Sequence, residues 1–170
     1  NYLELRNYLL NLGIKLRTTS GTEVIIELFV LEGPKMLSRL QGMFSFVIWD
    51  KHKKEAFAAR DPYGIKPLYI GYNSEGIILA SQVKTLLSTN LISKEKDFSS
   101  QSCFFQFGFV IEPRTWFKHI KSLKSGHYII IKNNRITYEK NWINLQNFWI
   151  QADQNKTKIK KKNLKNIIYE

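Results

Sequence analysis

One stretch of the chain, residues 43–69, constrains the fold more than any other. Its first eight residues, MFSFVIWD, are apolar or aromatic at nearly every position, which predicts a strand buried on both faces. The polar segment from Asp50 to Lys54 predicts a hairpin turn, and residues 56–60 predict the returning strand. The chain is therefore expected to form a buried hairpin that leads directly into a loop.

The loop that follows reads RDPYGIKPLY and carries two charged residues where it leaves the strand. Partly buried charges need partners, so we expect Arg60 and Asp61 to be a structural pair that shapes the loop and an adjoining domain contact. Gly64 lies between two prolines, which fix the backbone in a loop and not in a ladder. We therefore assign structural roles to Arg60, Asp61 and Gly64.

The remaining elements are predicted from apolar periodicity and from turn residues. The S-x-x-E string from Ser20 to Glu23 predicts a capping box that opens a helix. That helix is expected over residues 22–32, and further helices over 1–12, 82–87 (capped by Ser81) and 98–107. Hairpin strands are expected over 70–73 with 76–80 and over 127–132 with 135–138. Because the strands form hairpins and not strand–helix–strand units, the pattern predicts an α+β fold with mainly antiparallel sheets.

Composition limits the classes of function. The net charge of +12 invites nucleic-acid binding, but six lysines crowd residues 156–165 and the other basic residues lie among acidic ones. A solvated basic tail is therefore favoured, with no nucleic-acid partner. The single cysteine, Cys103, lies in an apolar string that predicts a structural thiol. No metal site, membrane span or secretory signal is evident, so a cytoplasmic protein is expected.

Three strings, LQGMFSFVIWD, ARDPYGIKPLYIGY and LASQVKTLL, together resemble the class II glutamine amidotransferase domain of the glutamine-dependent asparagine synthetase family. The resemblance covers residues 1 to about 145. It implies the N-terminal-nucleophile hydrolase fold, a four-layer αββα sandwich, here truncated at its N-terminal side. Residues 1–150 would be an incomplete amidotransferase domain, and residues 151–170 a Lys-rich linker toward a synthetase domain absent from this chain.

The resemblance also implies a reaction, in which glutamine is hydrolysed and its ammonia serves the ATP-dependent amidation of aspartate. In the family an N-terminal cysteine attacks the amide, its own α-amino group acts as base, and an Asn-Gly pair binds the oxyanion. Asn1-Tyr2 resembles the tail of the segment that carries this pair. The nucleophile and the pair would therefore precede the first residue, no catalytic residue is assigned here, and the chain alone is expected to be inactive. It needs no cofactor; ATP and magnesium are implied only for the synthetase domain.

One family site position falls inside the chain. The family string Ser-Asp-Thr-Glu, whose Asp holds the ammonium of glutamine, reads Ser20-Gly21-Thr22-Glu23 here. Gly21, with Ser20, therefore marks the expected glutamine-binding position without its acid. Two interpretations stay open: a weakened or repurposed amidotransferase, or compensation by Glu23 or another acid.

Other classes of function also stay open at this point. The domain could serve another amide acceptor, in polysaccharide or secondary metabolism, or it could be a non-catalytic interaction domain. A basic nucleic-acid-binding module is supported by charge alone. The expected partners are glutamine and a C-terminal synthetase domain of the same polypeptide, and a homodimer is left open.

Overall fold

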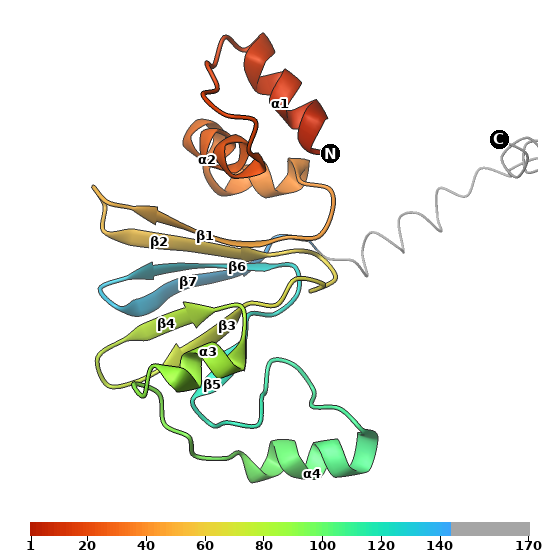
Figure 1. The fold of residues 1–170 in the computed structure, drawn as a ribbon, viewed down its shortest axis with the longest axis vertical. Helices are drawn as coiled ribbons and strands as arrows, with labels where there is room; N and C mark the ends of the chain where they lie inside the picture. Colours follow the sequence, from red (N-terminus) through yellow and green to blue (C-terminus); the bar gives the residue numbers. More distant parts are fainter. Residues whose placement is uncertain (144–170) are drawn as a thin grey trace, which may run out of the picture.

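The computed structural model describes residues 1–143 (Figure 1). Its helices are α1 (Tyr2–Asn11), α2 (Gly21–Glu32), the 3₁₀ helix η1 (Gly33–Arg39), α3 (Val83–Ser88) and α4 (Phe98–Phe107). Its strands are β1 (Ser45–Asp50), β2 (Glu55–Arg60), β3 (Tyr69–Tyr72), β4 (Ile77–Ala80), β5 (Ile120–Ser122), β6 (His127–Lys132) and β7 (Arg135–Asn141). The predicted linker at 151–170 lies outside the described residues.

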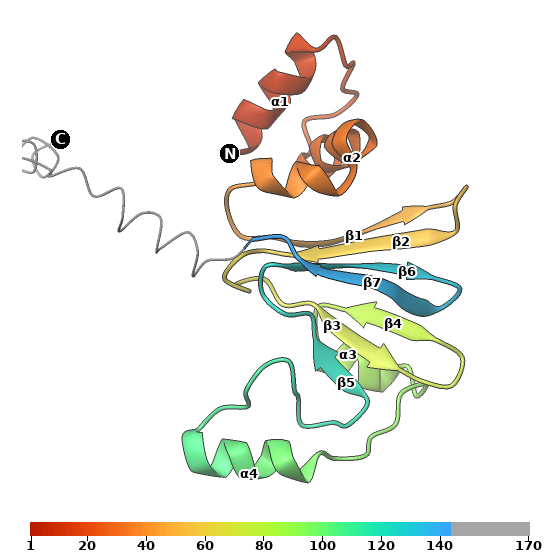
Figure 2. The same ribbon diagram turned by 180° about the vertical axis from the view of Figure 1, so that it is seen from behind.

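Two antiparallel sheets form the centre of the molecule. The first has the strand order β1-β2-β6-β7 and the second the order β4-β3-β5. Helices α1 and α2 cover the outer face of the first sheet, and α3 and α4 lie beyond the second (Figures 1 and 2). The predicted α+β, four-layer αββα arrangement is thereby confirmed. No helix among residues 1–143 is long and apolar enough to cross a membrane.

The core is divided among the three interfaces between these layers. Along β2, Phe57 and Ala59 face the helices, while Ala56 and Ala58 face the second sheet, as the two-residue period of a strand requires. Helices α1, α2 and η1 add Leu9, Leu28, Met36 and Leu37 to the first interface. The outer face of the second sheet packs on α3 through Leu86, Ile92 and Ile120.

Strand β1 is an edge strand, so the prediction that both its faces are buried is wrong. Phe46 and Ile48 pack under the helices, but Val47 and Trp49 on the opposite face are 43% and 56% exposed. From the first sheet, the core between the sheets takes residues of β2, β6 and β7 and none of β1. Apolar residues on both faces of a strand therefore do not guarantee burial, because burial depends on where the strand lies in the sheet.

The other predicted elements are confirmed, with one shift in a helix start. The turn from Asp50 to Lys54 is closed by Asp50 Oδ1, which accepts hydrogen bonds from the backbone N–H of His52 and Lys53 at 2.9 and 3.0 Å. Helix α3 begins at Val83 with Gln82 at its N-cap, so Ser81 is not the cap that the sequence predicted.

Candidate functional site

A pocket of about 200 Å³ opens where α1 and α2 begin and where the chain approaches β1. We call it the α1–α2 pocket. It is lined by Asn1, Tyr2, Leu5, Gly21, Val24, Ile25, Leu40, Gln41, Gly42, Met43 and Phe44. Among these described lining residues, none has a charged side chain. The pocket includes Gly21, the position at which the sequence predicts glutamine binding.

Asn1 joins two walls of this pocket. Its side-chain Oδ1 accepts a hydrogen bond from the backbone N–H of Gln41 at 3.0 Å, and its Nδ2 donates to the carbonyl oxygen of Arg39 at 3.0 Å. This pair of bonds holds the start of α1 against the segment that leaves η1. The pocket wall that begins at Gln41 is therefore positioned by Asn1, 40 positions earlier in the chain.

Gly21 is the first residue of α2, and the space beside it is open. A Cβ atom at Gly21 would meet Tyr2 Cδ2 at 3.7 Å, an ordinary van der Waals distance. The hydroxyl of Tyr2 donates a hydrogen bond to the carbonyl oxygen of Thr19, which fixes the ring next to this position. A larger side chain at position 21 would therefore fit beside the Tyr2 ring.

Glu23 does not line the α1–α2 pocket. Its carboxylate accepts hydrogen bonds from the Thr18 hydroxyl and from the backbone N–H groups of Arg17 and Thr18. The hydrogen bond from the Thr18 hydroxyl, followed by that from Arg17, lowers the pKa of Glu23. Glu23 thus faces the loop before α2, and its orientation gives no support to compensation for the missing acid.

The predicted capping box is half correct. Ser20 is the N-cap of α2 and its hydroxyl accepts a hydrogen bond from Thr22 N–H at 3.2 Å. The reciprocal bond, from Ser20 N–H to Glu23, is replaced by a bond to the Thr18 hydroxyl at 3.1 Å. The loop before α2 folds over the start of the helix, so the Glu23 carboxylate bonds to residues 17 and 18 and not to Ser20 N–H. Ser20 is exposed and lies next to the pocket without lining it.

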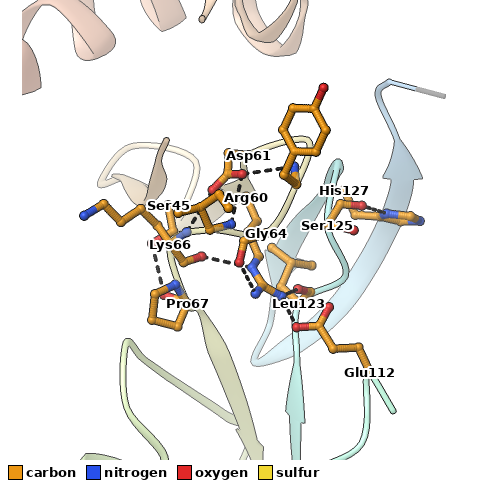
Figure 3. Close-up of polar contacts among 12 residues, drawn as sticks. Ser45, Arg60, Asp61, Gly64, Lys66, Pro67, Glu112, Leu123, Ser125 and His127 are labelled. Carbon is orange, nitrogen blue, oxygen red and sulfur yellow. Dashed lines mark hydrogen bonds and ion pairs between the residues drawn. The ribbon is translucent and has the colours of Figure 1, made fainter. Parts of the chain in front are cut away.

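Arg60, at the end of β2, is the centre of a second polar cluster (Figure 3). It is 5% exposed. Its guanidinium donates to the carbonyl oxygens of Gly64 and Leu123, both at 2.6 Å, and to that of Lys66 at 2.9 Å. It also forms an ion pair with Glu112 at 2.9 Å. Arg60 therefore joins the loop after β2, the end of β5 and the segment that contains Glu112.

Asp61 is fully buried and binds the backbone of its own loop. Its carboxylate accepts hydrogen bonds from the N–H groups of Tyr63, Ile65 and Lys66 at 3.0, 3.1 and 2.9 Å. Burial alone would raise the pKa of Asp61, but these hydrogen bonds outweigh burial and lower the pKa.

Arg60 and Asp61 both shape the loop, but they are not a pair with each other. The ion-pair partner of Arg60 among residues 1–143 is Glu112, 52 positions along the chain. Glu112 was not predicted from the sequence, because nothing in its local string indicates a partner so distant.

Gly64 lies where the loop passes the Arg60 guanidinium. Its φ is +64°, in the left-handed region that favours glycine. A Cβ atom there would lie 2.9 Å from Arg60 Nη2 and 3.2 Å from Ser125 Cβ. Both the backbone conformation and the lack of space therefore explain a glycine at this position.

The loop after β2 also supports a wall of the α1–α2 pocket. Asp61 N–H donates to the carbonyl oxygen of Phe44 at 2.8 Å, and the Ser45 hydroxyl donates to that of Pro67 at 3.1 Å. Phe44 is one of the pocket residues. The loop shaped by Arg60 and Asp61 thus holds the backbone that brings Phe44 to the pocket.

The remaining candidate groups lie away from this pocket. Cys103 is on α4, at the opposite end of the molecule from α1, and it is partly exposed and not in the core (Figure 1). His52 lies in the exposed turn between β1 and β2. Within residues 1–143, no three His, Cys, Asp or Glu side chains are grouped so that they could hold a metal ion.

The fold belongs to a known class of amidotransferases. The structure is similar to the glutamine phosphoribosylpyrophosphate amidotransferase from Bacillus subtilis, solved with ADP and GMP, at a TM-score of 0.60 and 21% identity. The match covers 83% of this chain and 26% of that chain. The described chain therefore has the N-terminal-nucleophile hydrolase fold of the class II amidotransferases.

Residues 1–143 match the family model described as "Glutamine amidotransferase domain", and the chain belongs to this family. It is 38% identical over 133 residues to asparagine synthetase [glutamine-hydrolyzing] 1 of Bacillus subtilis, covering 78% of this chain and 21% of that protein. It is 32% identical over 115 residues to amidase chry2 of Gibberella zeae, covering 68% and 16%. The chain thus spans about a fifth of the length of the curated relatives it matches. The resemblance to asparagine synthetase-type amidotransferase domains is confirmed.

Proposed function

We propose that this domain supplies ammonia by hydrolysing glutamine, and that a second domain uses the ammonia to amidate aspartate at the expense of ATP. The α1–α2 pocket carries this proposal, because it places Gly21 on the wall of a pocket in a domain of the amidotransferase family. Relatives that bear the name asparagine synthetase [glutamine-hydrolyzing] support the choice of substrate and acceptor.

Amide hydrolysis needs a nucleophile, a base and donors for the oxyanion. The lining of the α1–α2 pocket offers no thiol, and its one hydroxyl, that of Tyr2, is donated to Thr19. From the family resemblance, we assign the chemistry to an N-terminal cysteine and an Asn-Gly pair that would precede Asn1. Residues 1–143 contribute the pocket wall and the loop that supports it. ATP and magnesium are assigned to the second domain.

The test compares the complete gene product with the 170-residue chain. The complete protein should release glutamate from glutamine and form asparagine when aspartate, ATP and magnesium are supplied. The isolated chain should release no glutamate above background, and Cys103→Ser in the complete protein should leave glutamate release unchanged. If the isolated chain releases glutamate and this activity survives Cys103→Ser, the assignment of the catalytic residues to positions before Asn1 is wrong. A complete protein that releases none would favour a non-catalytic interaction domain.

Hydrolysis of a different amide is a second candidate, favoured by the uncharged pocket lining and by relatives named amidases. A pocket without an acid has no partner for the ammonium of glutamine. The complete protein would then prefer 5-amino-5-oxopentanoate, which keeps the amide and lacks the α-amino group. A kcat/KM that favours glutamine over this analogue by tenfold or more would exclude the second candidate.

A further inference from the structure

Helix α4 exposes a large apolar surface within the described part of the chain. Phe98 and Phe105 are 74% and 80% exposed, and Ser100 is the one fully buried residue of the helix. Both views place α4 at one end of the molecule, beyond the second sheet (Figures 1 and 2). We call this surface the α4 face, formed by Phe98, Phe104, Phe105, Phe107, Phe109 and Ile111.

The composition of α4 is typical of the buried centre of a protein–protein interface. Its sequence, FSSQSCFFQF, contains four phenylalanines and no charged residue. The buried centres of protein interfaces are enriched in aromatic residues and depleted of charged ones. A helix of ten residues is marginal in water unless its apolar side is packed. In the described chain the packing of α4 includes Phe104 against Trp116, with ring centroids 5.3 Å apart.

A pocket of about 330 Å³ lies beside the α4 face. Val110 and Glu112, which follow α4, form part of its wall together with Trp116 and Ser122. Val83 and Phe117 add to the apolar part of this wall, and Arg114 is a second charged residue beside Glu112. The pocket therefore has room for an apolar anchor side chain of a partner.

Three occupants can be weighed for this surface. A membrane surface would call for basic residues on the polar side of the helix, whereas α4 has Ser and Gln there. A second copy of the chain would bring together two molecules that each carry a net charge of +12. An adjoining domain is favoured by length, since the domain covers only 21% of a relative and 26% of the structural neighbour. A linked domain also meets the surface at high effective concentration.

We propose that the α4 face and the pocket beside it bind the adjoining synthetase-type domain of the same polypeptide. That domain places an apolar side chain in the pocket beside the α4 face. The inference rests on the proposed function, which supplies the second domain. Glu112, at the wall of this pocket, pairs with Arg60, which also holds the loop beside the α1–α2 pocket. The contact with the adjoining domain would therefore lie next to the loop after β2, which supports the α1–α2 pocket.

The test is photo-crosslinking in the complete gene product. p-Benzoylphenylalanine is placed at Phe105 and, as a matched control, at Leu3, which is 69% exposed on α1. After irradiation, mass spectrometry should find crosslinks from position 105 to residues of the same polypeptide beyond position 170, at least tenfold more abundant than from position 3. Crosslinks between two copies, no crosslink, or a gene product without a further domain would each overturn the proposal.

Hydrogen exchange gives a second measurement that needs no activity. In the complete protein, Phe105→Ser should speed amide exchange in α4 and in a segment beyond residue 170 at least tenfold, while Leu3→Ser should not. Because Phe105 is 80% exposed in the domain, its replacement should leave the folded core intact. Unchanged exchange in both segments would contradict the contact. A protein with this contact and no glutaminase activity would instead contradict the proposed function alone.

Discussion

At Gly64 the backbone passes so close to the Arg60 guanidinium that a methyl group would overlap it. Gly64→Ala should lower the free energy of unfolding by about 2–4 kcal/mol, from backbone strain at positive φ together with the clash. Gly13→Ala is the matched control, since Gly13 has a φ of +80° and no atom near its Cβ position. It should cost only about 1 kcal/mol. Urea unfolding measures both, and equal losses would refute the role of the clash.

Asp61 should make stability depend on pH. Its pKa is lowered in the folded chain, so its contribution is present above the unfolded pKa of about 3.9 and is lost as pH falls through the folded value. Asp61→Asn should cost about 1.5–3 kcal/mol at pH 7, because the amide keeps one acceptor oxygen and its NH2 group cannot accept from the N–H that bonds the other carboxylate oxygen.

The check is urea unfolding of both proteins from pH 7 to pH 2. The difference between wild type and Asp61→Asn should shrink as pH falls below about 4. A difference that stays constant across this range would show that the ionised carboxylate is not what stabilises the loop.

Gly21 tests the assignment of the substrate pocket. It is the first residue of α2, has no positive φ, and has room for a side chain beside Tyr2. Gly21→Asp should therefore fold, and its carboxylate suits the N-terminus of a helix. In the complete enzyme it should lower the KM for glutamine by up to about a hundredfold, as a charge-assisted hydrogen bond of about 3 kcal/mol allows. Steady-state kinetics measures this, and Gly21→Asn is the uncharged control. An unchanged or higher KM in folded Gly21→Asp would reject the pocket assignment.

Strands β1 and β2 show that the position of a strand within its sheet decides how far an aromatic side chain is buried. On β2, Phe57 is 4% exposed and its ring contacts those of Phe29, Phe46 and Tyr128. On the edge strand β1, Trp49 is more than half exposed. Two large aromatic residues on paired strands thus have very different surroundings.

Phe57→Ala should cost about 3–5 kcal/mol, because it removes a packed ring and leaves a cavity. Trp49→Ala should cost about 1 kcal/mol or less in the 170-residue chain, since most of its ring is in water. Chemical denaturation of the two variants gives the comparison. An equal loss of stability in the two variants would contradict the exposure of Trp49 on the face of β1 opposite the helices.

At the scale of the whole molecule, the two proposed binding regions lie at opposite ends of the layered fold. The α1–α2 pocket is at the helical end over the first sheet, and the α4 face is beyond the second (Figure 1). Arg60 lies between them, because it bonds the loop after β2 and also Leu123 and Glu112 on the side of the second sheet. Arg60 therefore links the loop that supports the α1–α2 pocket to Glu112, a wall residue of the pocket beside the α4 face.

The net charge of +12 also belongs to the whole molecule. The six lysines between positions 156 and 165 are the densest basic run, while other basic residues such as Lys118 and Lys132 pair with glutamates. Any binding to DNA of arbitrary sequence should therefore weaken steeply with salt and be lost when the chain is shortened to residues 1–150. Fluorescence anisotropy at low salt measures it. Binding that persists in the shortened chain would restore the nucleic-acid interpretation.

The sequence by itself determined the features that depend on neighbouring residues. The turns at Asp50–Lys54 and Asn133–Asn134, the helices before β1, helix α4 and the antiparallel hairpins all follow from local turn chemistry and apolar period. The motif strings were long enough to indicate the family. The pocket position marked by Gly21 came from that resemblance, and its role in substrate binding stays a prediction.

Only the tertiary structure decided which of these residues are buried and which partners they meet. It placed β1 at a sheet edge, gave Arg60 a partner 52 residues away, turned Glu23 toward Thr18, and left the phenylalanines of α4 exposed. Each outcome depends on how distant segments stack, and the physical reason is that apolar burial and the pairing of buried charges are set by neighbours in space and not in sequence.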